Sequence, residues 1–251
     1  MRFYNGFVKI ILLTMLYFSL PISATPVAKS GSEASELNLY TAKYNVLRGQ
    51  KKYGHATREL KKNSTSYSLS FNTSASIFFY SIDTSETSNF LWQDNTIILL
   101  SYEGRDSRSF KKDKNLELKF DQKHRSLIAK KNGDTSEHTF KDGVLDPLMT
   151  FEKLRLDAQA SDGFSNKEQL HYTVYDSNGF KEYHFLNSGR VIIDTPIGKL
   201  NCIKLSRVRK NSTRKTHIWL AIDYDFIPVM LIQEHKEEEV ATLIINSIEQ
   251  N

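Results

Sequence analysis

Cys202 is the one cysteine of the 251-residue chain, and it lies within the segment Pro196–Leu205. A reactive thiolate needs a lowered pKa, which a helix N-terminus or a paired histidine usually provides. Cys202 lies in the middle of an expected strand, with Leu200 and Lys204 on the same face, and is far in sequence from any expected helix start. We interpret Cys202 as a packing residue, because a buried free cysteine behaves as a small hydrophobe.

The other residue types that could catalyse or bind metal do not form recognised motifs. The seven histidines show neither H-x-H nor H-E-x-x-H spacing, which local zinc sites usually have. Ser109–Lys112 and Ser212–Lys215 match S-x-x-K, but both lie in polar loops and lack the companion motifs. We therefore expect no metal, no cofactor and no enzymatic activity. A metal site or an envelope hydrolase site assembled across several strands is the alternative.

The beginning of the chain has the layout of a secretory signal peptide. A basic start precedes the apolar run Ile10–Leu20, and small residues end the segment at Ala24. We predict a signal peptide over residues 1–24, cleaved after Ala24, and an exported, periplasmic protein of a bacterium. An uncleaved anchor is the alternative, although the apolar run is short for a membrane span. Residues 25–37 are small and polar, which indicates a flexible leader.

Composition limits the classes of partner. The chain is 39% hydrophobic and 12% aromatic, enough to build a core, and its net charge is +5. Loss of the leader would make it only mildly basic, and no nucleic-acid recognition element is present, so we expect no nucleic-acid partner. Pairs of lysines fall mostly at turns, where they favour solubility. Contact of these lysines with an anionic membrane surface is the alternative.

Residues 38–250 predict a single β-rich domain. Tyr40, Ala42, Tyr44 and Val46 share one face of an alternating segment, the mark of a half-buried strand. Asn-Gly and Asp-Gly pairs between such segments indicate tight turns. The expected strands cover residues 39–47, 66–73, 76–82, 87–92, 96–103, 116–120, 124–130, 135–140, 168–176, 180–187, 190–195, 199–209, 215–223, 228–235 and 239–248, with a turn at 187–189.

The period changes once, over residues 145–160. Asp146 and Pro147 form an N-cap followed by proline at the first helical position. Leu148, Phe151 and Leu154 then fall near one face of a helix of roughly three turns. The sequence thus predicts an all-β, mainly antiparallel fold: a large curled meander sheet, a barrel or half-barrel, with one mid-chain helix packed on it.

A concave sheet face must be filled by side chains, by the helix or by a ligand. Four residues are our candidates for ligand binding there: Arg155 on the helix, Tyr172 among the strand aromatics, and Trp219 with Asp223. Arg155 could meet a carboxylate such as Asp223 or the headgroup of a ligand. The alternative is that Arg155 has no role in ligand binding and forms a structural ion pair or is solvated.

Several short motifs occur in a suggestive order along nearly the whole predicted domain. They are Gly54-His55-Ala56, Asp146-Pro147, Leu154-Arg155, Thr195 with Gly198, Trp219 with Asp223, and Pro228-Val229. Together they resemble the bacterial exported proteins of domain-of-unknown-function family 3108. The resemblance implies a largely β, periplasmic or outer-membrane-associated protein without an assigned activity, similar in its curled sheet to carriers of lipoproteins and lipids. The chain lacks the cysteine after the leader that lipid-attached members have.

These observations favour a soluble periplasmic protein that binds an apolar or amphipathic ligand, lipid or lipoprotein-like, in its concave face without catalysis. An envelope protein is a further possible partner. The alternative is a structural or scaffolding partner of an outer-membrane assembly, which would need a large exposed apolar patch.

Overall fold

The computed structural model describes residues 36–165, 167–209 and 212–250. These residues belong to one compact unit. The predicted signal peptide and nearly all of the predicted leader lie outside the described residues. Within the described ranges, no helix has both the length and the apolar character needed to cross a membrane.

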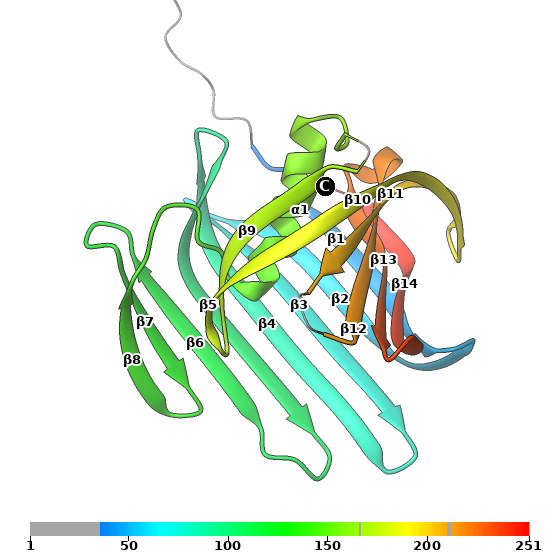
Figure 1. Ribbon diagram of the computed structural model, residues 1–251, viewed down its shortest axis with the longest axis horizontal. Helices are drawn as coiled ribbons and strands as arrows, with labels where there is room; N and C mark the ends of the chain where they lie inside the picture. Colours follow the sequence, from blue (N-terminus) through cyan, green and yellow to red (C-terminus); the bar gives the residue numbers. More distant parts are fainter. Residues whose placement is uncertain (1–35, 166, 210–211, 251) are drawn as a thin grey trace, which may run out of the picture. The chain divides into compact units, whose positions relative to one another are not determined.

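The described chain consists almost entirely of strands around one α-helix, as predicted (Figure 1). The elements are β1 Tyr40–Arg48, β2 Lys51–Asn63, β3 Ser66–Ile77, β4 Tyr80–Gln93, β5 Thr96–Arg108, β6 Lys114–Asp121, β7 Ser126–Lys131, β8 Asp134–Thr139, α1 Pro147–Ala160, β9 Gln169–Asp176, β10 Gly179–Thr195, β11 Gly198–Val208, β12 Arg214–Ala221, the 3₁₀ turn η1 Ile222–Tyr224, β13 Ile227–His235 and β14 Glu238–Gln250.

All fourteen strands form one sheet in the order β8-β7-β6-β5-β4-β3-β2-β1-β14-β13-β12-β11-β10-β9. Every neighbouring pair is antiparallel, so the sheet is two meanders joined where β1 pairs with β14. At that junction Tyr44 lies opposite Ile245. The two edges, β8 and β9, do not pair with each other, so the predicted curled meander is confirmed as an open sheet rather than a closed barrel.

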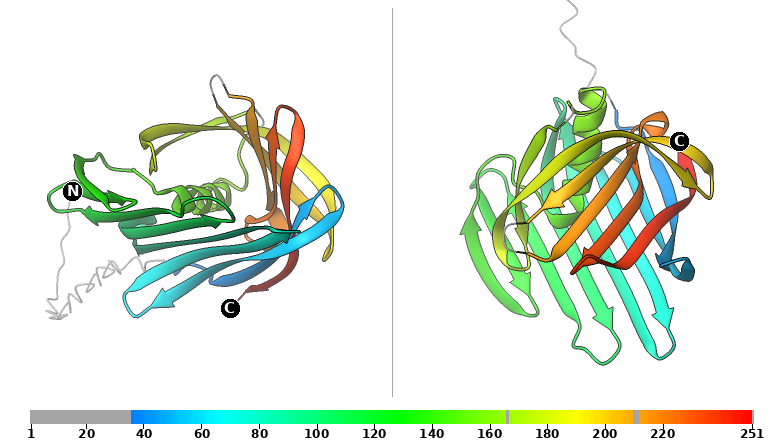
Figure 2. Two further views of the ribbon diagram at one scale, coloured as in Figure 1. Left: turned by 90° about the horizontal axis from the view of Figure 1, so that it is seen from below. Right: turned by 45° about the vertical axis from the view of Figure 1, so that its right-hand side comes forward.

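Helix α1 lies on the concave side of this sheet. It contacts β3 and β4 from one meander and β9 and β13 from the other, so the strands must curve around it (Figures 1 and 2). The helix begins as predicted: the Asp146 carboxylate accepts a hydrogen bond of 2.7 Å from the amide of Met149. Leu148, Met149 and Leu154 are buried against the sheet.

The segment before the helix links the two sheet edges. The Leu145 amide donates to the Thr173 carbonyl, and the Tyr175 amide donates to the Leu145 carbonyl, each at 2.9 Å. This short parallel bridge attaches the chain that leaves β8 to strand β9. The His138 ring of β8 also lies 5.2 Å from the ring of Tyr175. The open edges are thus held close without a strand ladder between them.

Two local predictions were wrong. Residues 76–82 do not form one strand, because Phe78 and Phe79 make a two-residue turn between β3 and β4. The turn expected at residues 187–189 is instead a bulge inside the continuous strand β10. The Asn187 side chain donates to the carbonyls of Phe164 and Ser165, both at 2.9 Å. These bonds fix the bulge, so β10 continues its pairing with β11.

Candidate ligand-binding site

A cavity of about 530 Å³ opens on the concave side of the sheet. Its wall comes from β4, β5, β6 and β7, from the start of α1, and from the turn between β9 and β10. Residues from both meanders therefore meet around it. We call it the polar cavity; the residues used below are Glu86, Tyr102, Lys114, Lys131, Pro147 and Asp176.

Strand periodicity places two lysines in the polar cavity. On β6, Lys114 shares a face with the buried Leu116 and Leu118. On β7, Lys131 shares a face with the buried Ala129 and lies opposite Leu116. The inward-facing rows are thus apolar over most of their length and end in lysines. Neither lysine forms an ion pair with another described residue.

Arg105 and Asp106 of the lining form ion pairs, whereas the partner of Asp176 is a neutral tyrosine hydroxyl. Arg105 donates to Asp113 at 2.7 Å, and Asp106 accepts from Arg108 at 2.6 Å. Asp176 accepts a hydrogen bond of 2.9 Å from the Tyr183 hydroxyl. Lys114 and Lys131 are thus the cations of the lining that form no ion pair with another described residue, and their ammonium groups are available to an anionic group at this position.

A carboxyl–phenol pair lies on the sheet side of the polar cavity. The Tyr102 hydroxyl donates to Glu86 at 2.7 Å. Burial raises the pKa of Glu86, although this hydrogen bond opposes the shift. Gly104 makes the arrangement possible: a Cβ at this position would lie 2.3 Å from the Tyr102 hydroxyl oxygen. Glycine in the middle of β5 therefore gives the tyrosine ring room to reach Glu86.

A second carboxyl is buried next to the polar cavity, one residue before Pro147. Asp146 Oδ1 accepts from the amide of Met149 and, at 2.9 Å, from the Ser88 hydroxyl. Its Oδ2 atom is buried and has no hydrogen-bond partner among the described residues. Burial raises the pKa of Asp146 to about 7, and the charge of Glu86 adds to the shift. This helix cap therefore holds a proton up to nearly neutral pH.

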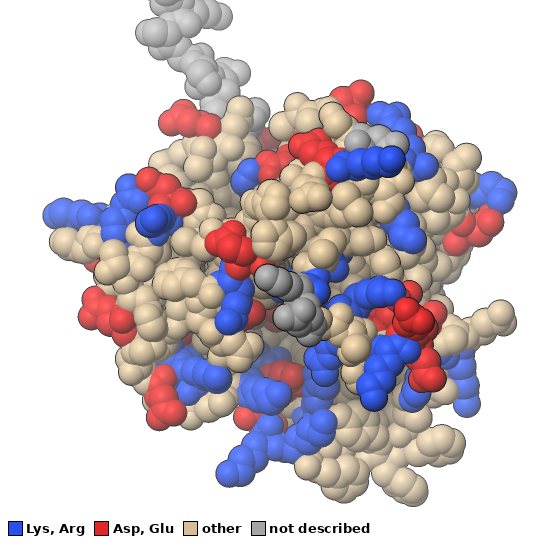
Figure 3. Space-filling view, in the orientation of Figure 1, with Lys and Arg blue, Asp and Glu red and all other residues tan. Residues whose placement is uncertain are grey.

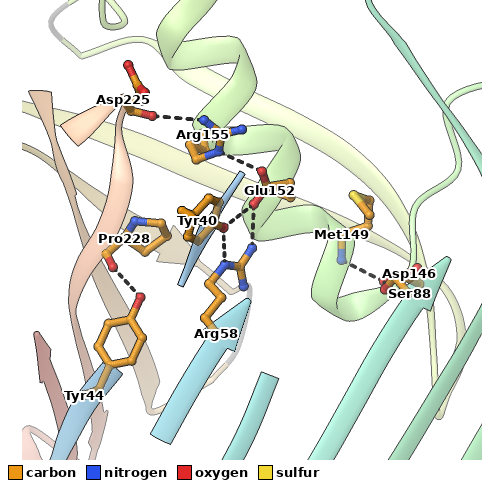
Figure 4. A network of polar contacts seen from close by, with 10 residues as sticks. All are labelled: Tyr40, Tyr44, Arg58, Ser88, Asp146, Met149, Glu152, Arg155, Asp225 and Pro228. Carbon is orange, nitrogen blue, oxygen red and sulfur yellow. Dashed lines mark hydrogen bonds and ion pairs between the residues drawn. The ribbon is translucent and has the colours of Figure 1, made fainter. Parts of the chain in front are cut away.

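Arg155, the predicted helix candidate, is only 1% exposed and lies in a buried ionic network (Figure 4). Its Nε donates to Glu152 Oε1 at 2.7 Å, and its Nη1 donates to the Asp225 carbonyl at 3.2 Å. Arg58 Nη2 and the Tyr40 hydroxyl both donate to Glu152 Oε2, at 2.9 and 2.7 Å. The helix is thereby tied to β1, to β2 and to the turn before β13.

The network keeps Glu152 ionised. Burial alone would raise its pKa, but the charges of Arg155 and Arg58 and the hydrogen bond from Tyr40 lower it to about 2. Arg155 therefore pairs with Glu152 and does not meet Asp223. This is the structural ion pair that was the alternative reading of Arg155.

The other three candidates lie in separate surroundings. The Tyr172 hydroxyl donates to Asp157 on the helix at 2.7 Å. Trp219 is buried under Lys204, whose ammonium group lies 5.1 Å from the centre of the indole ring. Asp223 is exposed and lines a second cavity of about 520 Å³. None of the four lines the polar cavity, and their role in ligand binding stays a prediction.

None of the residues that line the polar cavity was a ligand-binding candidate in the sequence. The available signal was a charged residue in phase with an apolar strand face: Lys114 with Leu116, and Glu86 with the buried Phe90. A metal centre has no support within the part of the chain that the structure describes, where no three His, Cys, Asp or Glu side chains cluster.

A family model described as a protein of unknown function, DUF3108, matches residues 39–238. The chain belongs to the DUF3108 family. The resemblance seen in the sequence is therefore confirmed. No curated protein matches the chain significantly.

Among solved structures, the DUF3108 chain is similar to a β-barrel-like protein of domain-of-unknown-function family DUF1849 from Brucella abortus. The match has a TM-score of 0.57 and 9% identity, and it covers 86% of this chain and 99% of that chain. At this identity the likeness concerns the fold alone, and a fold of this kind is compatible with ligand binding.

Proposed function

We propose that this protein is a periplasmic envelope protein that binds an amphipathic ligand, lipid or lipoprotein-like, in the polar cavity, and that it performs no catalysis. The observation that carries the proposal is the pair Lys114 and Lys131, which form no ion pair within the described chain and lie at the end of apolar strand faces, around a cavity of about 530 Å³. That volume lies within the usual range of ligand sites, roughly 300–1,000 Å³.

The chemistry of the lining suggests how such a ligand would lie. An anionic headgroup would accept hydrogen bonds from the two lysines. The apolar part would contact Leu116 and the rings of Tyr102 and Tyr183, which also line the cavity.

The proposal is tested by displacement of a fluorescent anionic amphiphile, together with native mass spectrometry after gentle purification. The variant Lys114→Gln/Lys131→Gln should bind at least about tenfold more weakly, since two charge-assisted contacts are lost. The matched control is Lys119→Gln/Lys123→Gln, which removes the same charge from the outer face of β6 and from the turn after it. No displacement by any lipid class, or equal affinity of both variants, would end the proposal.

Export is tested separately. Cell fractionation and the intact mass of the purified protein would reveal whether the chain reaches the periplasm and begins after Ala24. A cytoplasmic location would contradict this part of the proposal without touching ligand binding.

A further inference from the structure

Two phenylalanines at the turn between β3 and β4 are almost completely exposed. Phe78 is 93% and Phe79 is 90% accessible to solvent. Phe78 has a φ of 54°, in the left-handed region that a bulky residue rarely adopts and that glycine occupies at little cost. Local folding therefore does not explain aromatic residues here, and two such side chains in water are unfavourable unless something covers them.

A third exposed phenylalanine lies on the neighbouring turn. Phe110, between β5 and β6, is 89% accessible and has a φ of 62°. The two turns are bonded together: the Ser109 amide donates to the Ser81 carbonyl at 3.0 Å, and the Ser81 amide donates to the Ser109 hydroxyl at 2.9 Å. The three aromatic rings thus belong to one projecting end of the sheet.

Unpaired lysines accompany these rings. Lys111 and Lys112 directly follow Phe110, are exposed, and form no ion pair with another described residue. Figure 3 shows basic side chains gathered beside an uncharged protrusion at the lower end of this face, where Figure 1 draws the turns after β3 and β5. We call Phe78, Phe79, Phe110, Lys111 and Lys112 the aromatic tip.

We propose that the aromatic tip docks on an anionic membrane surface, with the phenylalanines inserted at the interface and the lysines against lipid headgroups. Three observations favour a bilayer over a protein partner or a second copy. The tip projects on turns instead of forming a broad face (Figure 1). Its apolar groups are few and aromatic, and its unpaired charges have a single sign that complements anionic lipid.

The aromatic tip and the polar cavity lie at the same end of the strands. Strand β6 begins at Lys114, two residues after Lys112, and Lys114 lines the cavity. On β4, Thr84 of the lining is four residues from Tyr80, roughly 13 Å along the strand. Docking by the tip would bring the cavity close to the headgroup layer. The docking proposal itself stands whether or not the cavity binds lipid.

Sedimentation with vesicles tests the docking. Protein purified after expression with its own leader, and of known intact mass, is mixed with vesicles of phosphatidylcholine alone or with added phosphatidylglycerol. Binding should require the anionic lipid and weaken with salt. The variant Phe78→Ser/Phe79→Ser/Phe110→Ser should partition at least about tenfold more weakly, given the apolar area removed. Lys111→Gln/Lys112→Gln should lose about fivefold per lysine and most of the salt dependence.

The matched controls are Ile192→Ser, which removes an apolar side chain 65% exposed on β10, and Lys119→Gln/Lys123→Gln. Both should bind vesicles like the unchanged protein. Equal binding to both vesicle types, or undiminished binding of the tip variants, would overturn the proposal. Sedimentation velocity without vesicles supplies a second test: a dimer that the triple phenylalanine variant abolishes would identify the tip as a self-association surface instead. Displacement of the amphiphile is measured without vesicles and tests the polar cavity alone. A failure of ligand binding can therefore be distinguished from a failure of membrane docking.

Discussion

Replacing Asp146 by asparagine should change how the stability of this protein depends on pH. The Asp146 carboxyl is fully buried, caps helix α1 through Oδ1, and leaves Oδ2 without a partner among the described residues. Asparagine keeps an acceptor oxygen for the Met149 amide and is an equally good N-cap. Asparagine cannot ionise. The substitution therefore removes the negatively charged form of residue 146, which burial disfavours.

The size of the effect follows from the two pKa values of Asp146. Burial raises the pKa from 3.8 to about 7 in the folded protein. Between these values the folded protein keeps a proton that the unfolded chain has released, so stability falls as pH rises. The loss is about 1.4 kcal/mol per pH unit, on the order of 4 kcal/mol by pH 7. This contribution is fully present below pH 3.8 and is lost once the pH exceeds about 7.

Thermal unfolding at a series of pH values from 4.5 to 8.5 measures this contribution. The Asp146→Asn variant should match the unchanged protein near the acidic end and unfold roughly 10 °C higher at pH 8, from about 2–4 °C per kcal/mol at this chain length. The Asp146→Ala variant is the control, because it loses the cap at every pH. If the unfolding temperatures of the Asp146→Asn variant and the unchanged protein differ by the same amount at every pH, the Asp146 carboxyl does not hold a proton in the folded protein.

Two further substitutions and one labelling experiment test other parts of the fold. Glu152→Gln should lower the free energy of unfolding by about 3–5 kcal/mol in chemical denaturation, because it leaves Arg58 and Arg155 buried without a countercharge; a loss below 1 kcal/mol would contradict the network. Gly54→Ala should cost about 1–3 kcal/mol in the same assay, because the new Cβ would lie 2.1 Å from the Ser74 carbonyl oxygen. Cys202 should resist alkylation by iodoacetamide at pH 8 until the protein is unfolded, because burial raises its pKa to about 12; rapid labelling of the folded protein would show a reactive thiol.

Much of the architecture could be predicted because its signals are local. The Asp146-Pro147 cap fixes the start of the helix, and alternation on β1 or β6 needs only neighbouring residues. The turn at Phe78 and Phe79 could not be predicted in this way. Nothing in these two residues supplies the positive φ of a tight turn, and their apolar character is typical of a strand. The conformation is therefore set by the pairing of β3 with β4, which a local pattern does not contain.

The ionic network around Arg155 and the polar cavity were harder to predict, because both depend on contacts between residues that are distant in sequence. Glu152 lies three residues before Arg155, so their pairing was visible in a helical sequence. Arg58 and Tyr40 reach the same carboxylate from strands about 100 residues away, and only the strand order places them there. Strand alternation alone could have placed Lys114 on the inward face of β6. That this face is open to a cavity at Lys114 depends on where helix α1 stops covering the sheet, which the local sequence does not show.

The position of the polar cavity follows from the different rise of helices and strands. Helix α1 and strand β4 both contain 14 residues. A helix of that length covers about 21 Å, whereas a strand extends about 46 Å. A single helix therefore cannot cover the concave face from end to end, and the inward rows must change from apolar to polar where its cover stops. On β6 that change comes between Leu116 and Lys114, next to the turn that carries the aromatic tip. An open cavity beside the turns that carry the aromatic tip thus follows from the length of this helix relative to the strands.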